Sequence, residues 1–324
     1  MNKKIEILCT LGPKSLNSKF LKFSNNNISL LRLNMSHIET KNLSKLIKFI
    51  RKYSDVPICI DTEGAQIRSK VKKKQYYKKN STLILSKVKG NFTIYPNDIF
   101  DKLKTNDIMD IGFNDLKAKV ISKKNDNIKL NVISSGLLEK NKGIHLINRK
   151  IKINFLTKKD WEAIEIAKSH NIKNYALSFT NSENDIIKFK KILPHCKKIY
   201  KIETEYAVKR FEKLIKYGDN FLIDRGDLSK EITTEMIPVV QRKILNISNK
   251  RKNKNIYIAT NFLETMIDNK SPTRGEANDI YSSLEMGAKG LVLAAETAIG
   301  NFTIESVLFL KNMIQVYKRH LKDL

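Results

Sequence analysis

The chain has 324 residues, and 61 basic against 33 acidic residues give it a formal net charge of +28. Hydrophobic residues make up 41% of the chain, which is enough for a large buried core and excludes a wholly disordered protein. No apolar run reaches the roughly 18 residues that a membrane crossing needs, and Met1 to Lys4 leads into a strand-like run instead of a secretory signal. We therefore expect a cytoplasmic protein with no membrane partner.

The positive charge is spread along almost the whole chain. Clusters such as Lys70 to Lys79 and Lys250 to Lys254 could contact RNA, but no array of stacking aromatic residues or nucleic-acid motif accompanies them. Nucleic acid is therefore not an expected partner. The spread positive charge would attract phosphorylated metabolites whether or not the chain also contacts RNA.

Short apolar runs recur along the chain at the pace of alternating strands and helices. Eight of them are strand candidates: Ile5 to Cys9, Ser29 to Leu33, Pro57 to Ile60, Tyr175 to Ser178, Ile199 to Ile202, Asn220 to Ile223, Asn255 to Ala259 and Gly290 to Ala294. Helical stripes lie between several of them, for example Leu43, Leu46, Ile47 and Ile50. The pattern predicts an α/β protein with a (β/α)₈ TIM barrel formed by residues 1–68 and 150–324.

Residues 69–149 interrupt this rhythm. Short alternating runs at Thr82 to Leu85, Phe92 to Tyr95, Ala118 to Ile121 and Ile128 to Val132 are separated by Asn, Asp and Gly turn residues. The segment is expected to be a small β-rich domain inserted after the third barrel strand.

Two carboxylates, a lysine and an arginine come together at the ends of two apolar runs, in Lys201-Ile202-Glu203 and Asp224-Arg225-Gly226-Asp227-Leu228. Glu203 and Asp227 offer hard oxygen ligands for Mg²⁺, and Lys201 can neutralise charge on a transferring phosphoryl group. A lone Lys-x-Glu is more often an exposed ion pair than a site. Here the neighbouring motifs favour the site.

Six other segments stand at comparable places near strand ends or helix starts. With the two just described, the motifs are TLGP (10–13), LRLNMSH (31–37), IDTEGAQIR (60–68), KIE (201–203), DRGDL (224–228), ATNFLETM (259–266), SPTRGEANDI (271–280) and AAETAIG (294–300). In their order and approximate spacing the chain resembles the pyruvate kinase family. The resemblance covers nearly the whole chain, although shared ancestry does not by itself fix the reaction.

The resemblance implies transfer of a phosphoryl group between phosphoenolpyruvate and a nucleoside diphosphate, the glycolytic reaction that forms pyruvate. It implies Mg²⁺ or Mn²⁺ at Glu203 and Asp227, and K⁺ at Asn34, Ser36, Asp61 and Thr62. The catalytic residues would be Lys201, Arg32 and Thr260, and substrate would be bound by Arg225, Gly226, Asp227 and Thr260. Arg68, His37 and Lys142 would contact the nucleotide, with a solvated turn as the alternative for Lys142.

The chain also departs from the family's pattern. Ala294, Ala295 and Ile299 stand where Ser, Gly and Lys are usual, and Asp224 stands where a small alanine is usual. Two alternatives therefore stay open: a lyase, aldolase or transferase that uses the same Mg²⁺-enolate core, and a non-catalytic homologue that binds phosphorylated metabolites. The family's C-terminal regulatory domain would begin where this chain stops, so control by sugar phosphates is not expected, and a homo-oligomer is compatible with the resemblance.

Overall fold

The computed structural model describes residues 4–112, 116–149 and 151–323, and it divides the chain into two compact units. Unit 1 consists of Met1–Gly64 and Lys158–Leu324, and unit 2 consists of Ala65–Thr157. Unit 2 thus begins at Ala65 where the sequence suggested Ser69, and it ends at Thr157 where the sequence suggested Arg149. Arg68, assigned to the barrel from the sequence, lies in unit 2.

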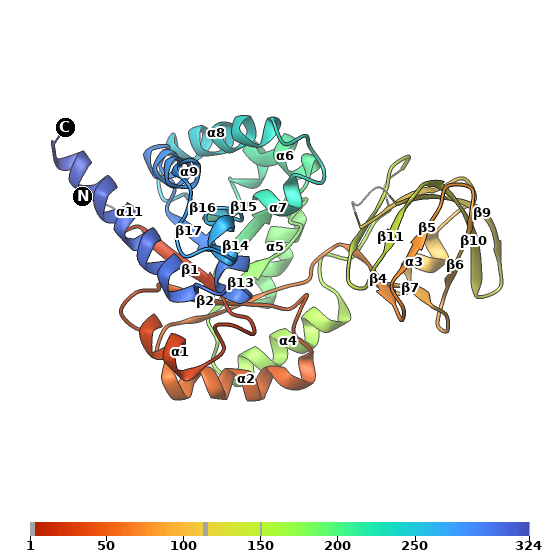
Figure 1. Cartoon of the computed structure of the whole chain (residues 1–324), viewed down its shortest axis with the longest axis horizontal. Helices are drawn as coiled ribbons and strands as arrows, with labels where there is room; N and C mark the ends of the chain where they lie inside the picture. Colours follow the sequence, from red (N-terminus) through yellow and green to blue (C-terminus); the bar gives the residue numbers. More distant parts are fainter. Residues whose placement is uncertain (1–3, 113–115, 150, 324) are drawn as a thin grey trace. The chain divides into compact units, whose positions relative to one another are not determined.

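Unit 1 contains a closed barrel of parallel strands (Figure 1). Around the barrel the strands follow the order β1 (Glu6–Thr10), β17 (Gly290–Leu293), β16 (Asn255–Ala259), β15 (Asn220–Asp224), β14 (Lys197–Ile202), β13 (Asn174–Leu177), β3 (Ile58–Asp61) and β2 (Leu30–Asn34). All eight predicted strands are present, with ends that shift by at most two residues. The predicted (β/α)₈ barrel is confirmed.

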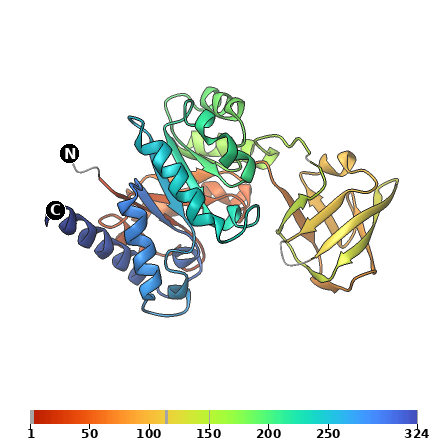
Figure 2. The same ribbon diagram turned by 90° about the horizontal axis from the view of Figure 1, so that it is seen from above.

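Helices surround this barrel on its outer side (Figures 1 and 2). They are α1 (Ser18–Ser24), α2 (Thr40–Tyr53), α4 (Lys158–Ser169), α5 (Glu183–Ile192), α6 (Glu205–Leu214), α8 (Met236–Asn249), α9 (Arg274–Glu285) and α11 (Thr303–Asp323), with the short turns α7 (Arg225–Leu228), η1 (Glu264–Ile267) and α10 (Ala295–Ala298). In α2 the stripe Leu43, Ile47 and Ile50 is buried, as expected for helical spacing. Among the described residues, no helix combines the length and apolarity that a membrane crossing requires.

The interior of the barrel consists of an apolar layer followed by a charged one. Leu30, Cys59, Ile199 and Leu222 belong to one buried cluster inside the barrel. Side chains two residues apart on a strand share a face, so the next inward positions toward the carboxyl ends are Arg32, Asp61, Lys201 and Asp224. The alternation of each strand therefore places a charged layer directly above the apolar one.

Unit 2 is a closed β-barrel of its own, whose strands curve around a common interior (Figure 2). Its strands run in the order β10 (Asn127–Ser134), β6 (Thr82–Ser86), β7 (Phe92–Tyr95), β4 (Ile67–Val71), β12 (Gly143–Leu146), β8 (Ile108–Ile111) and β9 (Lys117–Lys124), with the short helix α3 (Ile99–Lys102) and a separate pair of β5 (Gln75–Tyr77) and β11 (Gly136–Leu138). The core holds Leu83, Phe92 and Leu130 among many apolar residues. The insert is β-rich, as the alternating runs indicated.

One carboxylate fixes the end of β3 where the chain leaves unit 1. Asp160, on the first turn of α4, accepts hydrogen bonds from the backbone N–H groups of Glu63 (2.7 Å) and Gly64 (3.1 Å). Asp160 is fully buried. The residues at which the chain leaves unit 1 and returns to it are therefore neighbours in space.

Candidate active site

The charged layer at the carboxyl ends of the strands is buried and tightly paired. Arg32 on β2 donates from Nε to Asp61 Oδ2 (2.7 Å) and from Nη1 to Thr10 Oγ1 (3.0 Å), and its Nη2 lies 2.6 Å from the same Asp61 oxygen. The other oxygen of Asp61 accepts a hydrogen bond from Ser178 (3.2 Å). Residues at the ends of four strands thus meet in one place, as is usual for the carboxyl ends of barrel strands.

Lys201 lies at the centre of this layer. Its ammonium group is 2.7 Å from Glu203 Oε1, 3.2 Å from Asp224 Oδ2 and 3.5 Å from Asp61 Oδ2, and it donates a hydrogen bond to Ser178 Oγ at 3.3 Å. Only 3% of the residue is exposed. Burial disfavours its charged form, but the surrounding carboxylates of Asp61, Glu203 and Asp224 raise the pKa of Lys201 above its ordinary value. Lys201 is therefore a fixed positive charge.

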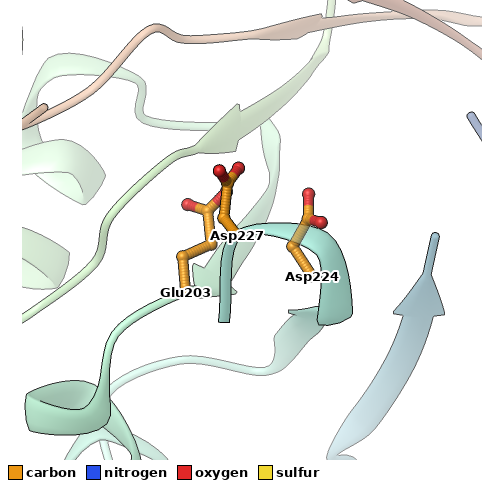
Figure 3. A group of neighbouring side chains, drawn as sticks. All are labelled: Glu203, Asp224 and Asp227. Carbon is orange, nitrogen blue, oxygen red and sulfur yellow. The ribbon is translucent and has the colours of Figure 1, made fainter. Parts of the chain in front are cut away.

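Three carboxylates from the ends of β14 and β15 form a cluster (Figure 3). One oxygen each of Glu203, Asp224 and Asp227 lies within 4.8 Å of the others. Figure 3 shows the carboxylates of Glu203 and Asp227 close beside each other, with Asp224 at the opposite end of the same turn. The group of hard oxygen donors fits a divalent cation such as Mg²⁺ or Mn²⁺.

Glu203 is the most deeply buried carboxylate of the cluster, with 1% of the residue exposed. Its Oε2 accepts a hydrogen bond from the N–H of Phe179 at 2.5 Å. Its Oε1 is buried and lies 2.7 Å from the ammonium group of Lys201. Burial, together with the charges of Asp227 and Asp224, raises the pKa of Glu203 to about 8, against the lowering effect of Lys201.

Asp224 makes its contacts with Thr260 and Lys201. Its Oδ1 accepts a hydrogen bond from Thr260 Oγ1 (2.7 Å), and its Oδ2 faces Lys201. Burial opposes ionisation of Asp224, but Lys201 and Arg32 hold the pKa of its carboxyl well below the ordinary value. Asp224 is therefore a permanent negative charge between Lys201 and Thr260.

Arg225 is engaged by protein groups around Thr260. Its Nε and Nη2 donate to the carbonyl of Thr260 (3.0 and 2.5 Å), and its Nη1 donates to both oxygens of Asp279 on α9 (2.9 and 2.7 Å). The guanidinium also lies over the ring of Phe262, 4.3 Å from its centre. These contacts hold Thr260 at a φ of +81°, a strained value for a β-branched residue.

Gly226 is needed for close packing in this turn. A Cβ atom there would lie 2.9 Å from the methyl carbon of Thr260. Asp227 follows within α7, and its Oδ1 forms an ion pair with Lys230 (2.6 Å). Because α7 begins at Arg225, the N–H groups of its first turn have no acceptor within the helix and can receive an anion.

The four residues expected at the K⁺ site lie at the ends of the neighbouring strands β2 and β3. Asn34 pairs in register with Asp61, and its side-chain oxygen accepts a hydrogen bond from the N–H of Ser36 (3.0 Å). Thr62 Oγ1 accepts from the N–H of Ser178 (3.0 Å). Because Arg32 and Ser178 already contact the Asp61 carboxylate, a monovalent ion here would share it with them.

The three residues expected at the nucleotide are divided between the units. His37 is an exposed residue of unit 1. Arg68 and Lys142 lie close to each other in unit 2, where Arg68 pairs in register with Gly143. Arg68 Nε is buried without a hydrogen-bond partner among the described residues, and Lys142 Nζ is 3.6 Å from Glu139.

Several residues that support the site were not recognised from the sequence. Ser178 contacts both Asp61 and Lys201, and its only signal was a hydroxyl at the end of a strand candidate. Glu296, in AAETAIG, is buried and accepts hydrogen bonds from the N–H groups of Leu263 (3.1 Å) and Ala294 (2.7 Å). The contacts of Ser178 and the bond from Leu263 to Glu296 join residues far apart in the chain, so they have no sequence signature.

The segment SPTRGEANDI (271–280) leads into α9 and supports the neighbouring strand ends. Thr273 caps α9 in a capping box with Glu276, whose carboxylate also accepts hydrogen bonds from the N–H and hydroxyl of Thr265. Asp279, three residues later, holds Arg225. The loop thereby connects α9 to the strand ends that carry the charged layer.

Comparison with known proteins identifies the family. Residues 2–307 match the family model described as pyruvate kinase, barrel domain. The chain is 29% identical to a pyruvate kinase of Thermotoga maritima, over 99% of this chain and 72% of the relative, and 31% identical to one of Methanocaldococcus jannaschii, over 100% and 71%. It is 28% identical to the plastidial pyruvate kinase 3 of Arabidopsis thaliana, of which it spans 56%. The chain belongs to the pyruvate kinase family.

Proposed function

We propose that this chain transfers a phosphoryl group between phosphoenolpyruvate and a nucleoside diphosphate, with Mg²⁺ or Mn²⁺ held by Glu203 and Asp227. The observation that supports this most strongly is the enclosure of Lys201 between carboxylates beside Arg32, in a buried layer at the strand ends. A fixed cation next to a cation-binding cluster is what phosphoryl transfer needs, because catalysis of this reaction consists mainly of positioning and charge neutralisation.

In the proposed reaction the bond between the enol oxygen and phosphorus breaks, and a terminal phosphate oxygen of the nucleotide forms the new bond. Lys201 holds positive charge near the transferring group. Arg32 can donate further hydrogen bonds to the same phosphoryl group. Its described contacts use one N–H on each of its three nitrogens, and a guanidinium has five N–H groups. A divalent ion in the cluster supplies further neutralisation of the phosphate oxygens.

The remaining roles concern binding and the proton. Backbone N–H groups of Gly226 and Asp227, in the first turn of α7, bind the substrate carboxylate. Thr260 stands next to the carbon that gains a proton as the enolate becomes pyruvate, and Asp224 orients its hydroxyl. His37, Arg68 and Lys142 bind the nucleotide, and Asn34, Ser36, Asp61 and Thr62 bind K⁺.

Asp224 also favours a second candidate function. A third carboxylate beside Lys201 alters the charge that an enolate would meet, which fits a lyase or aldolase reaction or transfer to another acceptor. A non-catalytic homologue is disfavoured, because a chain without catalytic function has no reason to keep Lys201, Glu203 and Asp227 together. The cytoplasmic location and a homo-oligomeric state stay predictions from the sequence.

Phosphorus-31 NMR of the purified protein with phosphoenolpyruvate, Mg²⁺ and a panel of nucleoside diphosphates distinguishes these functions. Formation of a nucleoside triphosphate together with pyruvate is the expected result. Release of inorganic phosphate, or loss of phosphoenolpyruvate into a new phosphorylated product, would favour the second candidate. An unchanged spectrum with every nucleotide would contradict both.

A further inference from the structure

A cavity lies on the amino-terminal side of the unit 1 barrel, opposite the strand ends that carry the charged layer. It is lined by the start of β1, by the end of α8 and the start of β16, by the turn between α9 and β17, and by the last turns of α11. Its volume is about 370 Å³, within the range of about 300–1,000 Å³ that is usual for small-molecule sites. The cavity is therefore of a size for a ligand and separate from the proposed active site.

Basic residues from each of these segments line the cavity. They are Lys4, Arg251, Lys254, Lys289 and Lys318, and no carboxylate is among the described residues of the lining. On a chain with a net charge of +28, scattered basic residues are expected. Here five of them converge on one concave surface from four separate segments, which concentrates positive charge where it can surround an anion.

Three of these cations have little compensating charge from the protein. The ammonium groups of Lys4 and Lys318 form no ion pair or hydrogen bond with any described residue, and Arg251 reaches only the carbonyl of Glu212, at 3.4 Å. The carboxyl ends of the surrounding helices each supply roughly half a negative charge, which offsets only part of the surplus. The cavity therefore favours a bound anion.

The other two lysines are held at the cavity and keep free donors. Lys254 donates to a backbone carbonyl (2.7 Å) and to Asp219 (2.9 Å). Lys289 donates to another backbone carbonyl (2.6 Å) and lies 3.8 Å from Glu6. The two lysine side chains are only 16% and 18% exposed. Because an ammonium group has three N–H donors, at least one on each remains for a ligand.

Part of the lining is apolar. These residues are Ile5, Leu284, Ala288, Tyr317 and Leu321. The ring of Tyr317 packs edge-to-face on Tyr281, with 5.6 Å between the ring centres, so it is held in place. A fixed aromatic ring offers a surface on which the organic part of a ligand can rest. The cavity thus suits a ligand that combines an anionic group with an apolar part.

We propose that this cavity binds a small organic phosphate. A phosphate group carries about two negative charges at neutral pH and has several acceptor oxygens, so it can engage more than one lysine and the planar fork of Arg251 together. A carboxylate has one charge and fewer acceptor positions. The site lies at the strand ends opposite Lys201, and the inference does not depend on the proposed reaction.

Titration calorimetry of the full chain with phenyl phosphate tests the inference, and benzoate is the comparison ligand with the same ring and a single charge. The wild type is expected to bind phenyl phosphate, and more tightly than benzoate. The double variant Lys4→Glu, Lys318→Glu should bind phenyl phosphate at least about tenfold more weakly. A hydrogen bond to a charged group usually contributes more free energy than a tenfold change in affinity requires.

The double variant Lys45→Glu, Lys48→Glu is the matched control, because it makes the same change of net charge on the exposed side of α2. It should bind phenyl phosphate like the wild type. Lys201→Met, which changes the proposed active site, should do so too. Circular dichroism verifies that each variant folds.

A wild type that does not bind phenyl phosphate would overturn the inference, whatever the variants do. An equal loss in the cavity variant and its charge-matched control would also overturn it, as would a loss confined to Lys201→Met. Benzoate binding as tight as that of phenyl phosphate would contradict the choice of a phosphate. Binding of a single-stranded RNA that the cavity variant weakens, without binding of phenyl phosphate, would make this surface a nucleic-acid contact instead.

Discussion

The ammonium group of Lys201 is surrounded by carboxylates that persist without it, so its substitution isolates one charge. Lys201→Met is expected to lower the turnover number by about 10²- to 10³-fold while the Michaelis constant changes much less, because the charge acts mainly in the transition state. Steady-state kinetics with phosphoenolpyruvate and a nucleoside diphosphate measure both constants. Lys209→Met, at an exposed ion pair with Glu205, is the control. Near-normal turnover in Lys201→Met would exclude the assigned role.

The changed end of β17 gives a second prediction at this scale. Ile299 is 56% exposed and cannot pair with phosphate oxygens, and Ala294 has no hydroxyl to carry a proton. The triple variant Ala294→Ser, Ala295→Gly and Ile299→Lys is therefore expected to bind ADP more tightly and to form pyruvate faster than the native chain. Calorimetry measures the first and a pyruvate assay the second.

Two results together would contradict this prediction. The native chain would already have a typical kinase turnover of roughly 1 to 100 per second, and the triple variant would be no faster. The three substitutions would then be neutral. The absence of a hydroxyl at Ala294 would then have no effect on proton transfer.

Individual residues show where sequence reasoning stops. It identified Lys201, Glu203 and Asp227 because their types and strand-end positions carry chemistry, and the structure brings them together. It did not find that Asp224 faces Lys201, because the direction of a side chain at a strand end depends on the register of the neighbouring strands. The contact of Ser178 with two strands was hidden for the same reason.

At the scale of elements, two glycines of the recognised motifs differ in their surroundings. In Gly12, just after β1, an added Cβ would lie 2.5 Å from the carbonyl oxygen of Ala298 at the end of α10. That carbonyl already accepts a hydrogen bond from the N–H of Lys14, so it cannot easily move. Gly275 lies exposed in α9, and the nearest atom to its Cβ would be 3.8 Å away.

Gly12→Ala should therefore destabilise unit 1 by about 1–3 kcal/mol, the usual result of overpacking. Gly275→Ala should stabilise it by about 0.4–1 kcal/mol, since alanine lowers the entropy of the unfolded chain and fits the helix. Urea unfolding followed by circular dichroism measures both free energies. Equal effects in the two variants would contradict the packing argument.

The barrel strands could be predicted from the sequence, whereas about half of the strands of the insert could not, for a physical reason. Barrel strands are buried on both faces and read as continuous apolar runs, such as Asn220 to Ile223. Strands of unit 2 such as β5 (Gln75–Tyr77) and β8 (Ile108–Ile111) are short and partly exposed, so their sequences resemble turns. The ends of the insert were misjudged because β4 continues directly from the motif that follows β3.

At the scale of the molecule, each unit has its own core. The ion pair between Asp107 and Arg149 lies within unit 2, so its loss should affect the stability of that unit. Asp107 is 3% exposed and accepts hydrogen bonds from Arg149 Nε (2.5 Å), Arg149 Nη2 (2.7 Å) and the N–H of Lys104 (2.7 Å). Burial opposes its ionisation, but these donors lower the pKa of Asp107 below its ordinary value. Its charged form is therefore stabilised by folding.

Arg149→Met should destabilise unit 2 by about 1–3 kcal/mol at neutral pH. Because the folded-state pKa is depressed, the contribution is fully present above the unfolded value of about 3.9 and is lost as the pH falls through the folded value. The difference between variant and wild type should accordingly shrink below about pH 4. Urea unfolding at several pH values, followed by near-ultraviolet circular dichroism, tests this, and a constant difference would contradict it. The Mn²⁺ binding proposed for unit 1 serves as the control and should not change.

Asp160 has a consequence for engineering. Since this one side chain binds the N–H groups of both Glu63 and Gly64 and stands two residues after Lys158, the cut ends that would remain after removal of unit 2 already lie next to each other. A turn of about two to four residues, the length common between neighbouring elements, should join Gly64 to Lys158 without opening the barrel. Such a shortened protein would allow the charged layer of unit 1 to be studied apart from unit 2, and other small domains could be grafted at the same junction.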